Sequence, residues 1–105
     1  MGKKVGIDSI AYYVPQLYLD IETLAVKRDI VPAKLQKGLG LTAMAICDAG
    51  EDAATMAAEA VLRLIENENI DPRDIGRLYM GTESALDAAK PTATYVSEIV
   101  EAAMK

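Results

Sequence analysis

The sequence predicts an α/β fold made of a strand, helices, a second strand and a last helix. Residues 5–14 and 75–81 are apolar and strand-like, and apolar positions recur at helical spacing over about 49–68. This order favours a partial βαβα unit of a parallel or mixed sheet with helices packed on it. Parallel strands are normally covered on both faces, so we expect the front part of a larger, incomplete domain.

Composition limits the class of protein. The 105 residues fit one domain, and the hydrophobic content of 51% excludes a disordered acidic chain. Phe and Trp are absent, so we expect a thin core. The net charge of −5 without any basic stripe argues against nucleic-acid binding. No apolar stretch has the length of a membrane span, so no membrane partner is expected.

Cysteine and histidine usage narrows the possible chemistry. Cys47 is the only cysteine, so an internal disulfide is impossible, and the N-terminus lacks a secretory signal. We therefore expect a reducing, cytoplasmic location. The sequence has no histidine, which removes the commonest general base and metal ligand. Catalysis within the chain would rest on carboxylates, Tyr, Lys or Cys47, and neither a metal nor a cofactor is expected.

The first half of the chain predicts short elements. The strand over residues 5–14 ends at Pro15, because proline cannot donate to a sheet. Asp20 is a suitable N-cap for a helix from Ile21 to about Arg28.

A second short helix is predicted from Pro32 to Lys37, since proline suits the first helical position. The glycines at Gly38 and Gly40 end it. Residues 41–47 form either a short strand or an extended buried segment, and periodicity does not decide between them.

The clearest prediction is a helix over about 49–68. Asp48 and Glu51 have the spacing of a capping box at its start. One continuous apolar face follows, formed by Ala53, Met56, Ala57, Ala60, Val61, Leu64 and Ile65. A turn over residues 71–74 leads to the strand at 75–81, and the last helix covers 91–104.

A polar loop follows the predicted strand that ends at Gly81. Glu83 stands near its start, and Pro91 opens the next helix. Open α/β sheets place their chemistry just past the ends of buried strands, which makes Glu83 a candidate functional carboxylate. Taken alone, the residues favour a structural role for Glu83, either capping the loop or forming a salt bridge in it.

Several strings together resemble one family. They are GIDSIAYYVP at the start, GLGLT, the acidic helix start after Cys47, and GTESALDAAKPTA over residues 81–93. They resemble the N-terminal part of archaeal and bacterial hydroxymethylglutaryl-CoA (HMG-CoA) synthases. The resemblance implies a thiolase-like fold of two similar α/β halves. Residues 1–105 would then be the incomplete N-terminal part of such a domain.

The resemblance also implies an activity. Family members are acyltransferases that condense acetyl-CoA with acetoacetyl-CoA to HMG-CoA, which feeds the mevalonate route of isoprenoid biosynthesis. A cysteine is acetylated, a glutamate removes a proton from the acetyl methyl group, and a histidine orients acetoacetyl-CoA. Glu83 matches the catalytic glutamate. The nucleophilic cysteine would lie beyond residue 105 and the histidine in the second half of the fold, so the chain alone is expected to be inactive.

The remaining candidates carry weaker expectations. Val31 and Pro32 match a turn that contacts the CoA part of the substrate, but Val31 replaces the usual aspartate and loses its side-chain hydrogen bond. Cys47 is not the nucleophile; we expect a small buried hydrophobe or a helix-entry residue, with a reactive thiol as the alternative. Asp87 and Lys90 either brace the loop or are merely solvated.

Other readings stay open. A ketoacyl synthase or thiolase of the same fold is disfavoured by the TES-ALDAAK string. The chain could also be a non-catalytic truncated or engineered module, or a subunit completed by another chain along its exposed sheet edges. The expected partners are acetyl-CoA and acetoacetyl-CoA, with a homo-oligomer or the missing part of the fold as protein partner.

Overall fold

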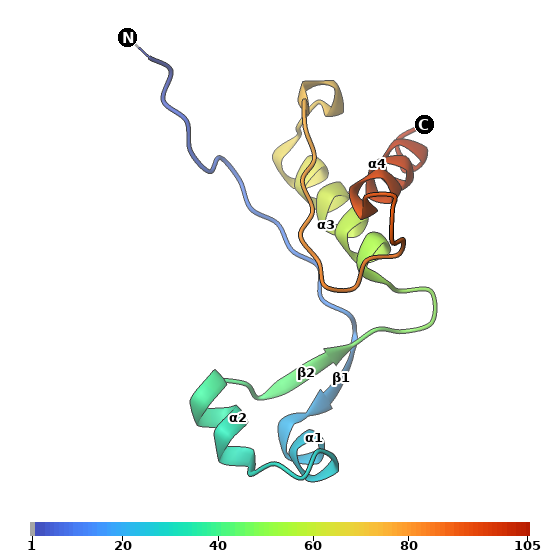
Figure 1. The fold of residues 1–105 in the computed structure, drawn as a ribbon. Coiled ribbons are helices and arrows are strands. Elements are labelled where there is room, and N and C mark those ends of the chain that lie inside the picture. Colours follow the sequence, from blue (N-terminus) through green and yellow to red (C-terminus); the bar gives the residue numbers. More distant parts are fainter. Residues whose placement is uncertain (1) are drawn as a thin grey trace. The chain divides into compact units, whose positions relative to one another are not determined.

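The computed structural model describes residues 2–105, which form two compact units (Figure 1). The sheet unit covers residues 14–51, and the helical unit combines residues 2–13 with 52–105. The sheet unit contains β1 (Leu17–Asp20), α1 (Ile21–Lys27), α2 (Pro32–Leu39) and β2 (Ala43–Ile46). The helical unit contains α3 (Ala53–Glu68), the 3₁₀ turn η1 (Pro72–Asp74) and α4 (Thr92–Ala103).

The sheet unit is organised around an antiparallel strand pair. Leu17 of β1 lies opposite Ile46 of β2, and α1 and α2 connect the two strands and pack together. Ile21 and Ala25, about one turn apart on α1, are almost fully buried. The side chains of β2 are exposed, so residues 41–47 contain a strand but not a buried one.

The helix starts in the sheet unit are those predicted from the sequence. The Asp20 carboxylate accepts a hydrogen bond from the backbone N–H of Thr23 at 2.9 Å and caps α1 as predicted. Pro32 opens α2, also as predicted. This helix continues two residues past the predicted end and stops at Gly40, whose φ of 68° lies in the left-handed region that favours glycine.

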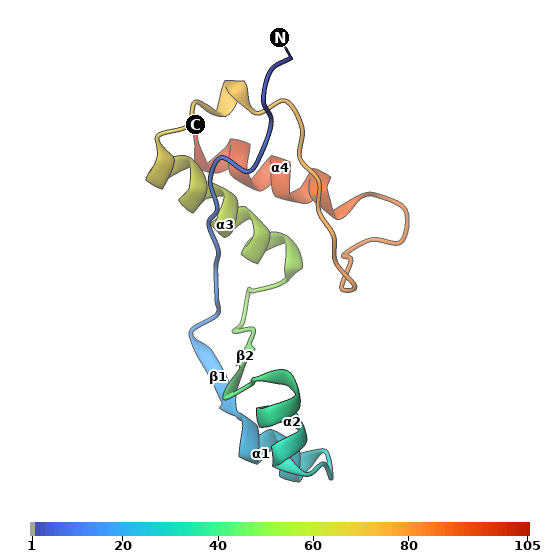
Figure 2. The same ribbon diagram turned by 90° about the vertical axis from the view of Figure 1, so that its left-hand side faces the viewer.

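The helical unit is built on the contact between α3 and α4, which lie side by side (Figure 2). Its buried core consists of Ala54, Ala58 and Ile65 from α3 with Val96 and Val100 from α4. Leu78 and Met80, in the segment between η1 and the following loop, are half-buried and pack against this core. Most of these side chains are small, which agrees with the thin core expected from composition.

The predicted start of the long helix was wrong. The capping box consists of Asp52 and Thr55, each of which accepts a hydrogen bond from the other's backbone N–H at 2.8 Å. The expected pair forms a separate turn instead, in which the backbone N–H of Asp48 donates to the Glu51 carboxylate at 3.0 Å. Gly50 between them has a φ of 82°, which a right-handed helix does not allow, so α3 begins only after Asp52.

Neither strand of the predicted parallel sheet was correct. Within the described residues, segments 5–14 and 75–81 are not strands, and the sheet is the antiparallel pair of β1 and β2. A strand requires a hydrogen-bonded neighbour, and no described segment pairs with these two. The second segment was also expected to be buried, yet Tyr79 is 81% exposed.

Residues 10–13 nevertheless have a definite place in the helical unit. They pass beside α3, where the Arg63 guanidinium lies 5.0 Å from the centre of the Tyr13 ring. The same arginine pairs with Glu59 one turn earlier on the helix.

None of the described helices has the length and apolar character needed to cross a membrane.

The capping box gives a direct test of the helix start. Asp52→Ala removes the acceptor for the first turn of α3 and should lower the free energy of unfolding by about 1 kcal/mol. Urea denaturation followed by circular dichroism measures this change. Asp48→Ala is the control and should cost clearly less, because Asp48 lies outside the helix. A larger loss for Asp48→Ala would contradict the observed start.

Candidate functional site

The candidate loop, residues 81–90, connects the core-packed segment to α4. Glu83 lies near its start and is exposed. Among the described residues its carboxylate makes no hydrogen bond or ion pair with protein. The backbone N–H of Ser84 donates instead to the Thr82 hydroxyl at 3.0 Å. The structural alternative for Glu83, a cap or a salt bridge in the loop, is therefore not formed.

Asp87 organises the second half of this loop. Its Oδ1 accepts hydrogen bonds from the backbone N–H groups of Ala89, at 2.8 Å, and Lys90, at 3.0 Å. Its Oδ2 accepts the hydroxyl of Tyr95 on α4 at 3.2 Å. These donors, the Ala89 N–H first, lower the pKa of Asp87 below its ordinary value. Asp87 therefore braces the loop as an ionised carboxylate.

Two residues of α4 complete the loop's attachment. One is Tyr95, whose ring centre lies 4.4 Å from the Lys90 ammonium. The hydrogen bond to Asp87 raises the pKa of the Tyr95 hydroxyl. Thr92 is buried, and its hydroxyl accepts the backbone N–H of Leu86 at 3.4 Å. Sequence reasoning missed both residues. Thr92 follows Pro91 at a predicted helix start, and this position could have marked its hydroxyl as a hydrogen-bond partner for the preceding loop. No spacing rule links Tyr95 to Asp87.

The second predicted contact region lies in the sheet unit. Val31 is the N-cap residue of α2, makes no side-chain cap and is 61% exposed. It lines an open hollow of about 390 Å³ together with Ala25, Val26, Asp29, Ile30 and Pro32. Glu83 belongs to the helical unit, so the predicted site residues are divided between the two units.

The expectation for Cys47 was wrong. The side chain is exposed and directly follows β2. It is also not a helix-entry residue, because α3 begins only at Ala53.

Within the described part of the chain, no group of three or more His, Cys, Asp or Glu side chains could hold a metal ion.

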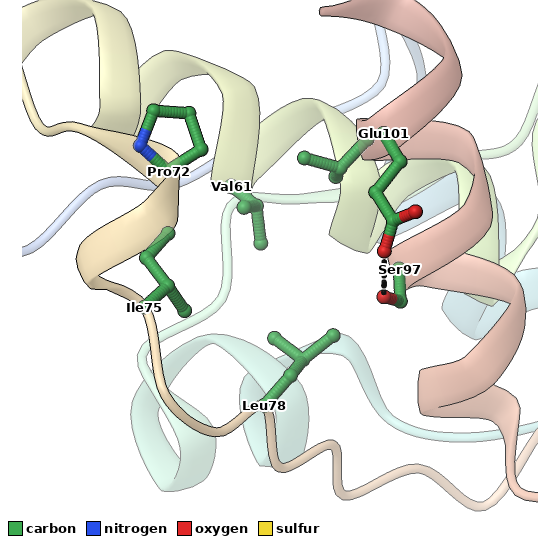
Figure 3. Close-up of a pocket in the computed structure, with 7 residues that line it drawn as sticks. Val61, Pro72, Ile75, Leu78, Ser97 and Glu101 are labelled. Carbon is green, nitrogen blue, oxygen red and sulfur yellow. Dashed lines mark hydrogen bonds between the residues drawn. The ribbon is translucent and has the colours of Figure 1, made fainter.

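A hollow of about 130 Å³ lies in the helical unit (Figure 3). It is lined by Val61, Pro72, Ile75, Leu78, Ser97, Val100 and Glu101. Its polar pair, the Ser97 hydroxyl and the Glu101 carboxylate, is joined by a hydrogen bond of 3.2 Å. The remaining lining is apolar, and Glu83 does not contribute to it, so this hollow is separate from the candidate loop.

Comparison with known proteins decides the family. A model of the N-terminal part of hydroxymethylglutaryl-coenzyme A synthase matches residues 1–104. The chain belongs to this family. The synthase of Haloferax volcanii is 40% identical over 98 residues, and that of Methanocaldococcus jannaschii is 38% identical over 97. These matches cover 92% of this chain but only 22% and 28% of the relatives, so the chain spans about a quarter of their length.

Solved structures agree with this assignment to the HMG-CoA synthases. MvaS in complex with 3-hydroxy-3-methylglutaryl coenzyme A is 46% identical, with a TM-score of 0.82 over 96% of this chain and 24% of its own. An HMG-CoA synthase complexed with CoA is 33% identical, with a TM-score of 0.66 over 91% of this chain and 24% of its own. The family predicted from the sequence strings is confirmed.

The lowered pKa of Asp87 predicts a pH-dependent stability. Because the pKa is lower in the folded than in the unfolded chain, the ionised carboxylate stabilises the fold above the ordinary aspartate pKa of about 3.9. This contribution is lost as the pH falls through the folded value. Asp87→Asn should therefore lower the unfolding free energy more at pH 7 than at pH 2.5. Urea titrations at both pH values measure the difference, and an equal loss at both would contradict the assignment.

Proposed function

We propose that residues 1–105 form the N-terminal part of a thiolase-like HMG-CoA synthase domain and supply its general base, Glu83. The complete enzyme would be an acyltransferase that condenses acetyl-CoA with acetoacetyl-CoA to HMG-CoA, a step toward isoprenoids by the mevalonate route. One observation carries the role of Glu83. Its carboxylate has no protein partner among the described residues, although the loop around it is held to the core at both ends.

The reaction explains why a carboxylate is needed. A methyl group next to a thioester is a weak carbon acid, so a base must be aimed at it and shielded from water. Glu83 takes the methyl proton, and the released electron pair forms the new carbon–carbon bond to the ketone carbon of acetoacetyl-CoA. The ketone oxygen then takes a proton and becomes the hydroxyl of the product. Because Glu83 is exposed in this chain, substrate and the rest of the enzyme would exclude water from it.

We extend the proposal to the start of α2, where Val31 and Pro32 would contact the CoA part of a substrate. The first turn of this helix has no acidic residue, and helix N-termini favour anions such as the CoA phosphates. The nearby Asp29 opposes this attraction in part. Val31 has no side-chain acceptor, so its contact would be made by the backbone.

A second candidate function is a subunit or module completed by another polypeptide. The observation that favours it is that segments 5–14 and 75–81 belong to no strand of the sheet that the described residues form. Both expose apolar side chains, including Ile7 at 84% and Tyr79 at 81%. Such segments are suited to pairing with additional strands, from the remainder of the fold, from a second copy or from another chain.

The role of Glu83 can be tested in a hybrid enzyme. Residues 1–105 replace the matching part of the Methanocaldococcus jannaschii relative, and release of the CoA thiol from acetyl-CoA in the presence of acetoacetyl-CoA is followed. Glu83→Gln keeps the shape but removes the base, so kcat should fall by about 10²–10⁴-fold. Glu98→Gln on the exposed side of α4 is the matched control and should leave kcat unchanged. Near-normal activity of the Glu83→Gln hybrid would refute the proposed role.

The 105-residue chain alone provides the second arm of this experiment. It has no histidine and, by the family pattern, lacks the nucleophilic cysteine, so we expect no sustained thiol release from it. Steady turnover by the isolated chain would show that the catalytic set is different from the one proposed.

The proposed CoA contact predicts that a substitution of Val31 can strengthen substrate binding. In the hybrid, Val31→Asn supplies a side-chain acceptor without adding a negative charge beside the CoA phosphates, and it should lower the KM for a CoA substrate by about threefold, the effect of one modest hydrogen bond. Initial rates at varied acetyl-CoA and acetoacetyl-CoA concentrations measure it. An unchanged or higher KM for both substrates would place the contact elsewhere.

A further inference from the structure

Tyr95 joins the candidate loop to α4 by two contacts of different kinds. Its hydroxyl donates to the Asp87 carboxylate at 3.2 Å. Its ring lies under the Lys90 ammonium, with 4.4 Å between the nitrogen and the ring centre. Both contacts reach residues of the candidate loop that contains Glu83, and neither involves Glu83 itself.

The other side of Tyr95 belongs to the core. The residue is half-buried and packs against the cluster formed by α3 and α4. Tyrosine suits this arrangement, because its rigid ring can be held by apolar contacts while its hydroxyl reaches a polar partner. The position of the hydroxyl is therefore set by helix packing and not by the loop.

Asp87 passes this restraint to the backbone of the loop. One carboxylate oxygen accepts the Tyr95 hydroxyl, while the other accepts the N–H groups of Ala89 and Lys90. Without the Tyr95 hydroxyl, the Asp87 carboxylate would lose its link to α4, and the turn that it forms with Ala89 and Lys90 would open more often.

The restraint acts close to the proposed base. Glu83 precedes Asp87 by four residues, and on its other side Met80 packs against the core. We infer that Tyr95 is a positioning residue that, through Asp87, holds the loop in the conformation from which Glu83 acts. This inference rests on the proposed function of Glu83. Small displacements of a catalytic group are costly, since about 1 Å can reduce a rate by about 10²-fold.

The first measurement concerns the loop itself and uses the full 105-residue chain. Tyr95→Phe keeps the packed ring and removes only the hydroxyl. Amide hydrogen exchange at Ala89 and Lys90 should become about tenfold faster, as expected for loss of one charge-assisted hydrogen bond. Exchange along α3 should stay unchanged. Tyr12→Phe, at an exposed tyrosine of the same unit, is the control and should leave the loop amides unaffected.

The second measurement concerns catalysis and uses the hybrid enzyme. Tyr95→Phe should lower kcat about tenfold and change the KM for each CoA substrate by less than about twofold, because the base is misplaced while substrate binding is kept. Asp87→Asn leaves the core intact and should reproduce this effect. The double variant should be no slower than the slower single variant, since both changes remove the charge-assisted bond between the Tyr95 hydroxyl and the Asp87 carboxylate.

The outcomes separate the inference from the function on which it rests. If Glu83→Gln abolishes turnover while Tyr95→Phe and Asp87→Asn keep normal kcat, the positioning role is wrong and the proposed function stands. If Glu83→Gln keeps turnover, the proposed function is wrong, and the catalytic part of the inference fails with it. Faster exchange throughout α3 and α4 in Tyr95→Phe would show a general stabilising role and would also overturn the inference.

Discussion

The packing of α3 on α4 is the contact on which the rest of the helical unit depends. Ala54 and Ala58 offer little area each, but their small side chains let Val96 and Val100 approach closely. Each buried methylene contributes about 0.8 kcal/mol, so a core of this size is modest. The extended segment before the loop and the ring of Tyr95 both lie on this helix pair. The geometry of the loop is therefore a consequence of helix packing.

The loop itself is held by polar contacts and has little apolar attachment of its own. Asp87 accepts the N–H groups of Ala89 and Lys90 and the hydroxyl of Tyr95, and Thr92 accepts the N–H of Leu86. Hydrogen bonds are directional, so they fix a loop conformation more precisely than burial does. Among the residues that the structure describes, the Glu83 carboxylate makes no hydrogen bond or ion pair. The proposed proton abstraction by Glu83 would require such an available carboxylate in a fixed position.

Sequence reasoning succeeded where the deciding contact is local. Asp20 caps a helix through an N–H three residues away, and Pro32 needs only its own ring to favour a first helical position. It failed at the start of α3, where two acidic residues with capping potential stand four positions apart. Asp48 has a partner at the right spacing, but the left-handed backbone of Gly50 makes Asp52 the cap.

The sequence by itself determined the family and the existence of the helices, because these depend on motifs and on contacts within about one helical turn. The family motif also made Glu83 the candidate base, which stays a prediction. Only the tertiary structure decided that Leu17 pairs with Ile46, that Tyr95 bonds to Asp87, and that residues 5–14 have no strand neighbour within the described part of the chain. A strand is defined by its partner, and a hydroxyl on one element meets a carboxylate on another only after both have packed. Such pairings have no periodic signature in the chain.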